Sequence, residues 1–212
     1  TVDGGDVVVN GTLDSVGANV DLGAIDDLTT NSTVDASTEV LLTTENGDVA
    51  VNGTVTSDTT TITINAGDNL TTTGADLLAV TGVTTTAGGA SSFDGLVTAT
   101  TGPVSITSED DVTTTANGDV NGDSVVIAST AGSVDLDGTV VADTTSATIT
   151  AAIDVTADDT ITAQTNVAVT GGRNVVLNET VTATTGNIDL EATAGSLTTG
   201  QNGDLIATAG NV

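Results

Sequence analysis

Apolar and polar residues alternate along most of the chain, in short stretches that end at a corner. The segments 49–55, 62–67 and 78–83 share one scheme: apolar, polar, apolar, then Asn or Thr, then Gly within two residues. Alternation with a period of two indicates a strand with one buried face. Asn and Gly supply the backbone conformations that tight corners require. The pattern therefore predicts many short strands joined by corners. No helix is expected, because no stretch shows helical spacing.

A longer repeat of about 42 residues runs through the chain, a period within the range of known repeat architectures. A motif of the type Val-Asn-Gly-Thr-Leu begins at Val9, and related motifs begin at Val51, Phe93, Leu136 and Leu177. Successive starts differ in position by 42, 42, 43 and 41. A second series of strand-like triplets starts at positions 62, 104, 147 and 188, with intervals of 42, 43 and 41. Because two independent series keep the same step, the repeat reflects the architecture.

Repeats built from short strands predict an all-β fold, a parallel β-helix or β-solenoid with an internal repeat of about 42 residues. An immunoglobulin-type sandwich would need longer repeats and a large buried aromatic residue. Two turns of about 21 residues or three of about 14 residues fit the repeat. We favour the longer turn, which gives on the order of 10 turns and a rod roughly 48 Å long. Phe93, the single aromatic residue, is expected to fill the core. Residues 1–212 are expected to form one repetitive domain, a segment of a longer protein or filament.

The charge balance removes several classes of function. The chain has 1 Lys or Arg and 29 Asp or Glu, a formal charge of −28. Such a chain cannot neutralise a nucleic-acid backbone, and anionic membrane surfaces repel it. No apolar run reaches the roughly 18 residues of a membrane helix. The absence of Cys and His excludes structural zinc, haem, iron–sulfur clusters and disulfides. Because His, Lys and Cys are missing as bases and nucleophiles, we expect no enzyme.

Runs such as 47–55 and 183–192 resemble the β-helical repeats of large secreted bacterial surface adhesins of the filamentous-haemagglutinin type. The resemblance covers nearly the whole chain. It implies an extracellular location at the cell surface and a role in a stalk or filament. Neither end carries a recognisable cap, so we expect end-to-end self-association or contact with neighbouring repeats. Cell-surface glycans are a further expected partner.

One segment has the side chains of a calcium site. Asn117, Asp119, Asn121 and Asp123 alternate with glycine and valine. Alternating oxygen ligands in a glycine-rich loop can wrap a hard cation such as calcium. A solvated loop built from Asn and Asp turns is the alternative. Divalent cations would in any case relieve the repulsion among the carboxylates.

The same segment is expected to be an inserted loop. The step in position from Ile106 to Ile127 is 21, whereas the step from Val51 to Ile64 is 13. If these two pairs occupy equivalent positions, the unit of strand and corner is longer around residues 117–123 than it is around residues 51–64.

Three Asn-x-Thr sequons share one position of the repeat, at Asn10, Asn52 and Asn178. In an organism that glycosylates asparagine, glycans on them would line one edge of the rod. The alternative is that Asn-Gly-Thr serves only to turn the chain at a corner.

Threonine runs occur at positions 59–61, 71–73, 84–86 and 113–115. Regular threonine rows on a flat β-helix could order water and bind ice. The starts of the runs differ in position by 12, 13 and 29, which is too irregular for a clean array. Ordinary solvent-facing strand and corner positions are therefore the favoured interpretation.

These features predict an extracellular structural or adhesive repeat protein that forms a stalk, fibre or surface-layer segment. Calcium stabilisation and end-to-end assembly are additional expectations. The alternative is a binding module, an adhesin or ice-binding face that recognises a sugar, a mineral or ice. A contiguous flat Thr or Asp face would favour the binding module, and evenly scattered polar corners would count against it.

Overall fold

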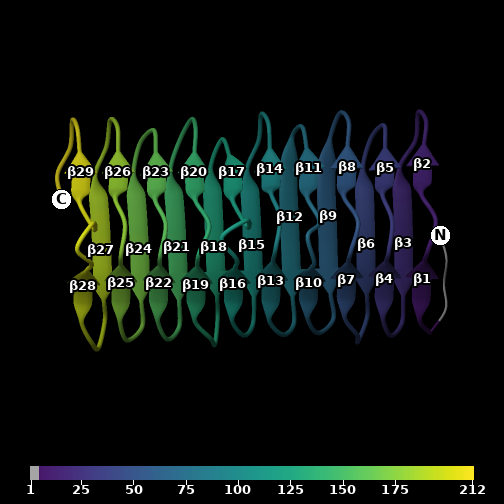
Figure 1. Cartoon of the computed structure of the whole chain (residues 1–212), viewed down its shortest axis with the longest axis horizontal. Coiled ribbons are helices and arrows are strands. Elements are labelled where there is room, and N and C mark those ends of the chain that lie inside the picture. The colour runs from purple at the N-terminus through teal and green to yellow at the C-terminus, as the bar shows by residue number, and fades with distance from the viewer. Residues whose placement is uncertain (1–4) are drawn as a thin grey trace.

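The computed structural model describes residues 5–212. These residues form 29 short strands and no helix. The strands lie in three parallel sheets, here called A, B and C, and each full turn of the chain visits the sheets in that order (Figure 1). Sheets A and B have ten strands each and sheet C has nine. The predicted parallel β-solenoid is confirmed.

The strands of sheets A and B are three residues long. Sheet A contains β1 (Val7–Val9), β4 (Leu28–Thr30), β7 (Val49–Val51), β10 (Leu70–Thr72), β13 (Ser91–Phe93), β16 (Val112–Thr114), β19 (Val134–Leu136), β22 (Val155–Ala157), β25 (Val175–Leu177) and β28 (Leu197–Thr199). Sheet B contains β2 (Leu13–Ser15), β5 (Val34–Ala36), β8 (Val55–Ser57), β11 (Leu77–Ala79), β14 (Val97–Ala99), β17 (Val120–Gly122), β20 (Val140–Ala142), β23 (Ile161–Ala163), β26 (Val181–Ala183) and β29 (Leu205–Ala207).

Sheet C is the wide face of the solenoid, because its strands have five or six residues. It contains β3 (Val20–Ala24), β6 (Val40–Thr44), β9 (Thr61–Ala66), β12 (Gly82–Ala87), β15 (Val104–Ser108), β18 (Val125–Ser129), β21 (Ala147–Ala151), β24 (Val167–Gly171) and β27 (Ile188–Ala192). The longer strands give each turn at least two outward residues on sheet C, whereas sheets A and B offer one per strand.

Each strand from β1 to β26 pairs in parallel with the strand three places later in the chain. Val7 lies opposite Leu28, Leu28 opposite Val49, and Val49 opposite Leu70. One turn therefore takes about 21 residues, and the described chain makes about 10 turns. The favoured turn length is confirmed, and the shorter alternative is wrong.

The repeat seen in the sequence is two turns, because the last position of the sheet A strands alternates between two classes of residue. Every second turn carries a large apolar residue there: Val9, Val51, Phe93, Leu136 and Leu177. The turns between carry a smaller residue: Thr30, Thr72, Thr114, Ala157 and Thr199. Around Phe93, Leu136 and Leu177, the smaller residues of the adjacent turns leave room for the larger side chain in the narrow core.

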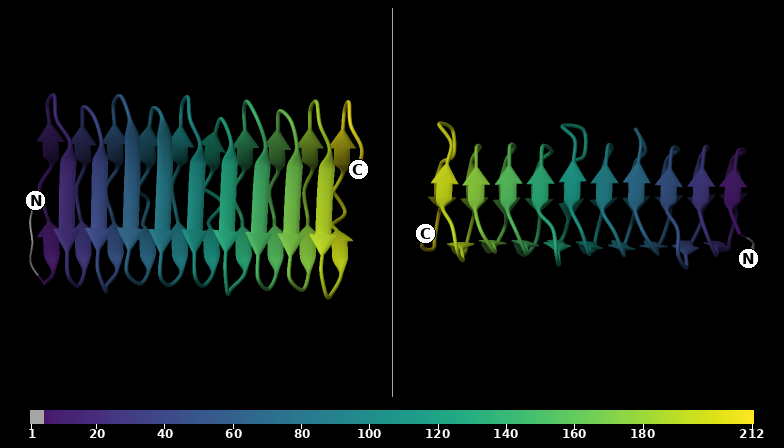
Figure 2. Two further views of the ribbon diagram at one scale, coloured as in Figure 1. Left: turned by 180° about the vertical axis from the view of Figure 1, so that it is seen from behind. Right: turned by 90° about the horizontal axis from the view of Figure 1, so that it is seen from below.

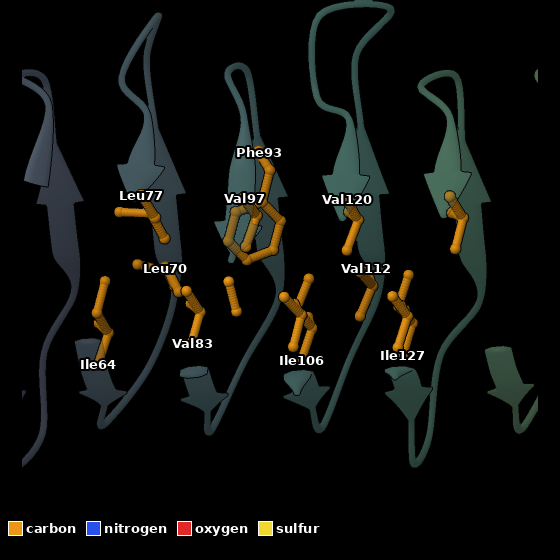
Figure 3. Packing of buried hydrophobic residues seen from close by; sticks show 14 of the residues in the cluster. Ile64, Leu70, Leu77, Val83, Phe93, Val97, Ile106, Val112, Val120 and Ile127 are labelled. Carbon is orange, nitrogen blue, oxygen red and sulfur yellow. The ribbon is translucent and has the colours of Figure 1, made fainter. Parts of the chain in front are cut away.

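The interior is one continuous apolar core. Phe93 is completely buried, which confirms its predicted inward position. Figure 3 shows its ring inside the solenoid, together with Val, Leu and Ile side chains of the neighbouring turns. The central inward position of sheet C is Leu, Ile or Val in every strand except β12, where it is Thr85. Thr85 is 1% exposed, and its Oγ1 has no hydrogen-bond partner.

We expect Thr85→Val to raise the free energy of unfolding by about 1 kcal/mol, because a methyl group replaces an unpaired buried hydroxyl of similar shape. Denaturant titration would measure the change. Thr114→Val is the matched control, since Thr114 Oγ1 accepts the backbone N–H groups of Asp137 and Gly138. That variant should lose stability. The same sign of change in both variants would contradict the prediction.

Corner side chains tie each turn to the next. Asp48 Oδ1 accepts the backbone N–H of Asn69 at 2.9 Å, and Asn69 Oδ1 accepts that of Ala90 at 2.9 Å. At a later turn, Asp154 Oδ1 accepts the N–H of Asn174 at 3.0 Å. These side chains satisfy backbone donors that would otherwise be unpaired at the corner. The abundance of Asp and Asn in the corners is thus partly structural.

Candidate functional site

The negative charge of the molecule is concentrated at the corners. Of the 29 acidic residues, Asp3 lies outside the described residues, and six lie in strands: Asp14, Asp21, Asp35, Asp135, Asp189 and Glu191. The other 22 lie outside the strands, at the corners. The flat faces of the three sheets are therefore mostly uncharged.

The broadest uncharged surface is the outer face of sheet C from β6 to β24. Its seven strands contribute two aligned outward residues each, which alternate with buried ones; Thr61, a third outward residue at the start of β9 opposite Gly82, is not counted. We call these fourteen residues the neutral face: Leu41, Thr43, Thr63, Asn65, Thr84, Thr86, Ser105, Thr107, Val126, Ala128, Thr148, Thr150, Ala168 and Thr170. Eight of them are threonine and none is charged. The flanking strands restore charge, through Asp21 on β3 and Asp189 and Glu191 on β27.

The neutral face is a regular grid. Thr84 lies in register with Thr63 on one side and Ser105 on the other, and Thr86 with Asn65 and Thr107. Parallel pairing places neighbouring strands about 4.8 Å apart, and alternate residues of one strand about 6.6 Å apart. In Figure 2 the strands of sheet C lie side by side and keep the same direction along the whole axis. The branched threonine side chains are stiff at χ1. The outward positions therefore repeat in two directions; threonine or serine occupies nine of the fourteen, and β18 carries neither.

The four threonine runs do not form this grid. Only the run 84–86 contributes to the neutral face. The runs 71–73 and 113–115 belong to sheet A and the corners that follow it, and the run 59–61 ends at Thr61, the first residue of β9. The irregular spacing of the runs therefore says nothing about the face. The signal in the sequence is instead outward threonines at alternate strand positions, one or two on six of the seven strands.

The four predicted calcium ligands do not share one loop. Asn117 and Asp119 lie in the corner between β16 and β17, Asn121 lies within β17, and Asp123 follows that strand. The corner has five residues, whereas the equivalent corner between β13 and β14 has three. An insertion of two residues is therefore present. The prediction that the whole segment 117–123 is an inserted loop is wrong, because residues 120–122 pair as a strand.

The carboxylates of this segment have hydrogen-bond partners in the following turn. Asp119 Oδ1 accepts the backbone N–H and the hydroxyl of Thr139, both at 2.8 Å. Asp123 Oδ1 accepts the hydroxyl of Thr144 at 2.8 Å. Among residues 5–212, no three His, Cys, Asp or Glu side chains are grouped so that they could hold a metal ion. Calcium binding by this segment stays a prediction.

The three sequon asparagines lie in the corner between sheets A and B, along one edge of the rod. Asn31 Nδ2 donates to Asn10 Oδ1, and Asn52 Nδ2 donates to Asn31 Oδ1, both at 2.9 Å. Asn178 Nδ2 donates to Asp158. The amide nitrogens of Asn52 and Asn178, which a glycan would occupy, thus hold neighbouring turns together. Glycosylation stays a prediction.

Two carboxylates have opposite electrostatic surroundings. Burial, and then the charges of nearby aspartates, raise the pKa of Asp135. Arg173 donates hydrogen bonds to both carboxylate oxygens of Asp154. This pairing, with additional hydrogen bonds from Asn174, lowers the pKa of Asp154 to about 2. Folding therefore disfavours the ionised form of Asp135 and favours the ionised form of Asp154.

We expect Asp135→Asn to raise the Tm at pH 7 and Asp154→Asn to lower it. Asp135 holds its proton more tightly when folded, so its charged form opposes folding at pH 7, and this penalty disappears as the pH falls through its raised pKa. Asp154 stabilises the fold above the unfolded pKa of about 3.9 and loses this contribution as the pH falls toward about 2. Thermal unfolding between pH 7 and pH 2 would measure both. A lower Tm for Asp135→Asn at pH 7 would contradict the prediction.

No family model matches the chain, and no curated protein or solved structure matches it. The resemblance to adhesins of the filamentous-haemagglutinin type thus stays an expectation, and the fold is shown by the geometry of the chain itself. Within residues 5–212, no helix is long and apolar enough to cross a membrane.

Proposed function

We propose that the chain is a structural segment of an extracellular stalk, fibre or surface layer, and that it acts by keeping an extended shape. The observation that supports this is the uninterrupted stack of about ten turns over one apolar core. Backbone hydrogen bonds pass from every turn to the next along the axis. Because each turn depends mainly on its neighbours, such a stack keeps its form over any number of turns.

The acidic corners favour separation of neighbouring rods. Like-charged edges repel one another, and salt or divalent cations weaken that repulsion. Among residues 5–212, the strands β1–β3 and β27–β29 are the first and last of their sheets, so further turns, from this chain or from another, would pair with them. An unpaired strand edge is a template for another strand. We therefore include end-to-end assembly in the proposal, with calcium screening the carboxylates at the junction.

Electron microscopy and X-ray scattering of the purified chain would test the proposal, in millimolar calcium, after chelation, and in a sodium salt of equal ionic strength. Rods at least about 48 Å long support the structural role, and compact or expanded particles contradict it. Filaments that form only in calcium support assembly at calcium-screened junctions. Single rods in all three conditions contradict the assembly step and leave the rod itself supported. Filaments in the sodium control show that calcium is not required.

A further inference from the structure

We propose that the neutral face on sheet C is a binding surface for ice. Its first property is the absence of charge over two outward positions per strand, whereas the uncharged stretches of sheets A and B offer one per strand. A molecule with a formal charge of −28 leaves fourteen contiguous outward positions without a single carboxylate. Of the described acidic residues, 22 lie in the corners, beside the sheets rather than on them. Corner hydrogen bonds account for part of this separation, but they do not require the outer face of sheet C to be free of carboxylates.

An ice surface is a partner of matching chemistry. It is uncharged, flat and rigid, and it repeats hydrogen-bond donors and acceptors in two directions. A carboxylate facing it would lose hydration without gaining an ion partner, at a large free-energy cost. A threonine hydroxyl both donates and accepts a hydrogen bond. Its methyl group gains from removal from liquid water. The eight threonines of the neutral face present both groups side by side.

The face is also ordered before any partner arrives. Thr63, Thr84 and Ser105 are held in register by backbone pairing on both sides of β12. On each of these three strands, the residues before and after the outward residue are buried. This burial fixes the direction in which the outward side chain points. A partner that binds such a grid orders few additional side chains, which lowers the entropic cost of binding.

Two other occupants fit less well. Seven strands spaced about 4.8 Å apart, each about 17 Å long, give a face of roughly 500–600 Å². A stable protein interface buries about 800 Å² per partner, so the face is small for a dimer. Two copies would also bring their acidic edges together.

A crystalline polysaccharide is likewise flat and uncharged, but sugar rings are commonly held by stacking on aromatic side chains. The single aromatic residue here, Phe93, is completely buried.

Partition of the chain into slowly growing ice tests the proposal, with two matched variants. Thr86→Glu places a carboxylate in the neutral face on β12, and Thr71→Glu places one on sheet A at β10. Both threonines are exposed and point outward from a strand. We expect the parent chain and Thr71→Glu to enter the ice. We expect the ice partition coefficient of Thr86→Glu to fall about tenfold, or about 1.4 kcal/mol. Circular dichroism would establish that both variants keep the fold.

Three results would overturn the proposal. The first is exclusion of the folded parent chain from ice. The second is an equal loss of partition in Thr71→Glu, which would show that the neutral face is not the contact. The third is a Thr86→Glu variant that partitions into ice as the parent does but has lost another interaction of the parent. That interaction would be binding to powdered cellulose or chitin, or dimerisation seen in sedimentation. None of these results bears on whether the chain forms rods, which scattering measures separately.

Discussion

Replacing Phe93 with alanine is expected to lower the free energy of unfolding by about 3–5 kcal/mol. Phe93 is the largest side chain in the core and is completely buried. It lies in register with Thr114, and Thr72 occupies the same place one turn earlier. Because both neighbours in the column are small, they cannot move in to fill the cavity that alanine would leave. The cost should therefore fall at the upper end of the usual range.

Phe93→Leu is the matched control for this prediction. Leucine occupies the same column at Leu136 and Leu177, so the position accepts it without a change in backbone. We expect a cost of less than about 1.5 kcal/mol for this swap. Unfolding should be followed by more than one probe, because repeat proteins can lose two-state behaviour. A loss in Phe93→Ala no larger than in Phe93→Leu would contradict the packing argument.

The fold was predictable because strand and corner signals are local. Period-two alternation and Asn-Gly pairs are each decided within a few residues. The turn length was less accessible. The period of about 42 residues says how often the sequence recurs, but it does not say how many turns one period contains. The number of turns depends on which strands pair, as Val7 does with Leu28. The large-to-small alternation at Phe93 and Thr114 doubles the sequence period relative to the structural one.

The candidate site was less predictable, because it depends on which positions are equivalent. Ile106 and Ile127 occupy the same place in adjacent strands of sheet C, one turn apart. Val51 and Ile64 lie in different sheets within one turn, so their shorter separation indicates no insertion elsewhere. The neutral face was missed for the same reason. Its threonines are spread over six strands far apart in the sequence, and only the assignment of every third strand to sheet C brings them together.

A second large loss of stability is expected for Gly102→Ala. A Cβ at this position would lie 1.8 Å from the carbonyl oxygen of Thr81 and 2.4 Å from its carbonyl carbon, in the preceding turn. These are backbone atoms, which cannot rotate away as a side chain can. Moving Gly102 instead would strain its carbonyl, which accepts the N–H of Asp123 at 2.8 Å in the following turn. We expect a cost of about 3 kcal/mol, the upper end for overpacking.

Gly11→Ala separates this steric effect from the general effect of removing a glycine. A Cβ at Gly11 would meet nothing within 4 Å. Alanine there restricts the unfolded chain without a clash, so stability should stay within about 0.5 kcal/mol of the parent or rise slightly. Hydrogen exchange adds a local readout, since the amide of Asp123 should lose protection in Gly102→Ala and keep it in Gly11→Ala. Equal stability of the two variants would contradict the prediction. It would mean that adjacent turns can move apart at this corner, so that the close backbone contact at Gly102 does not hold them together.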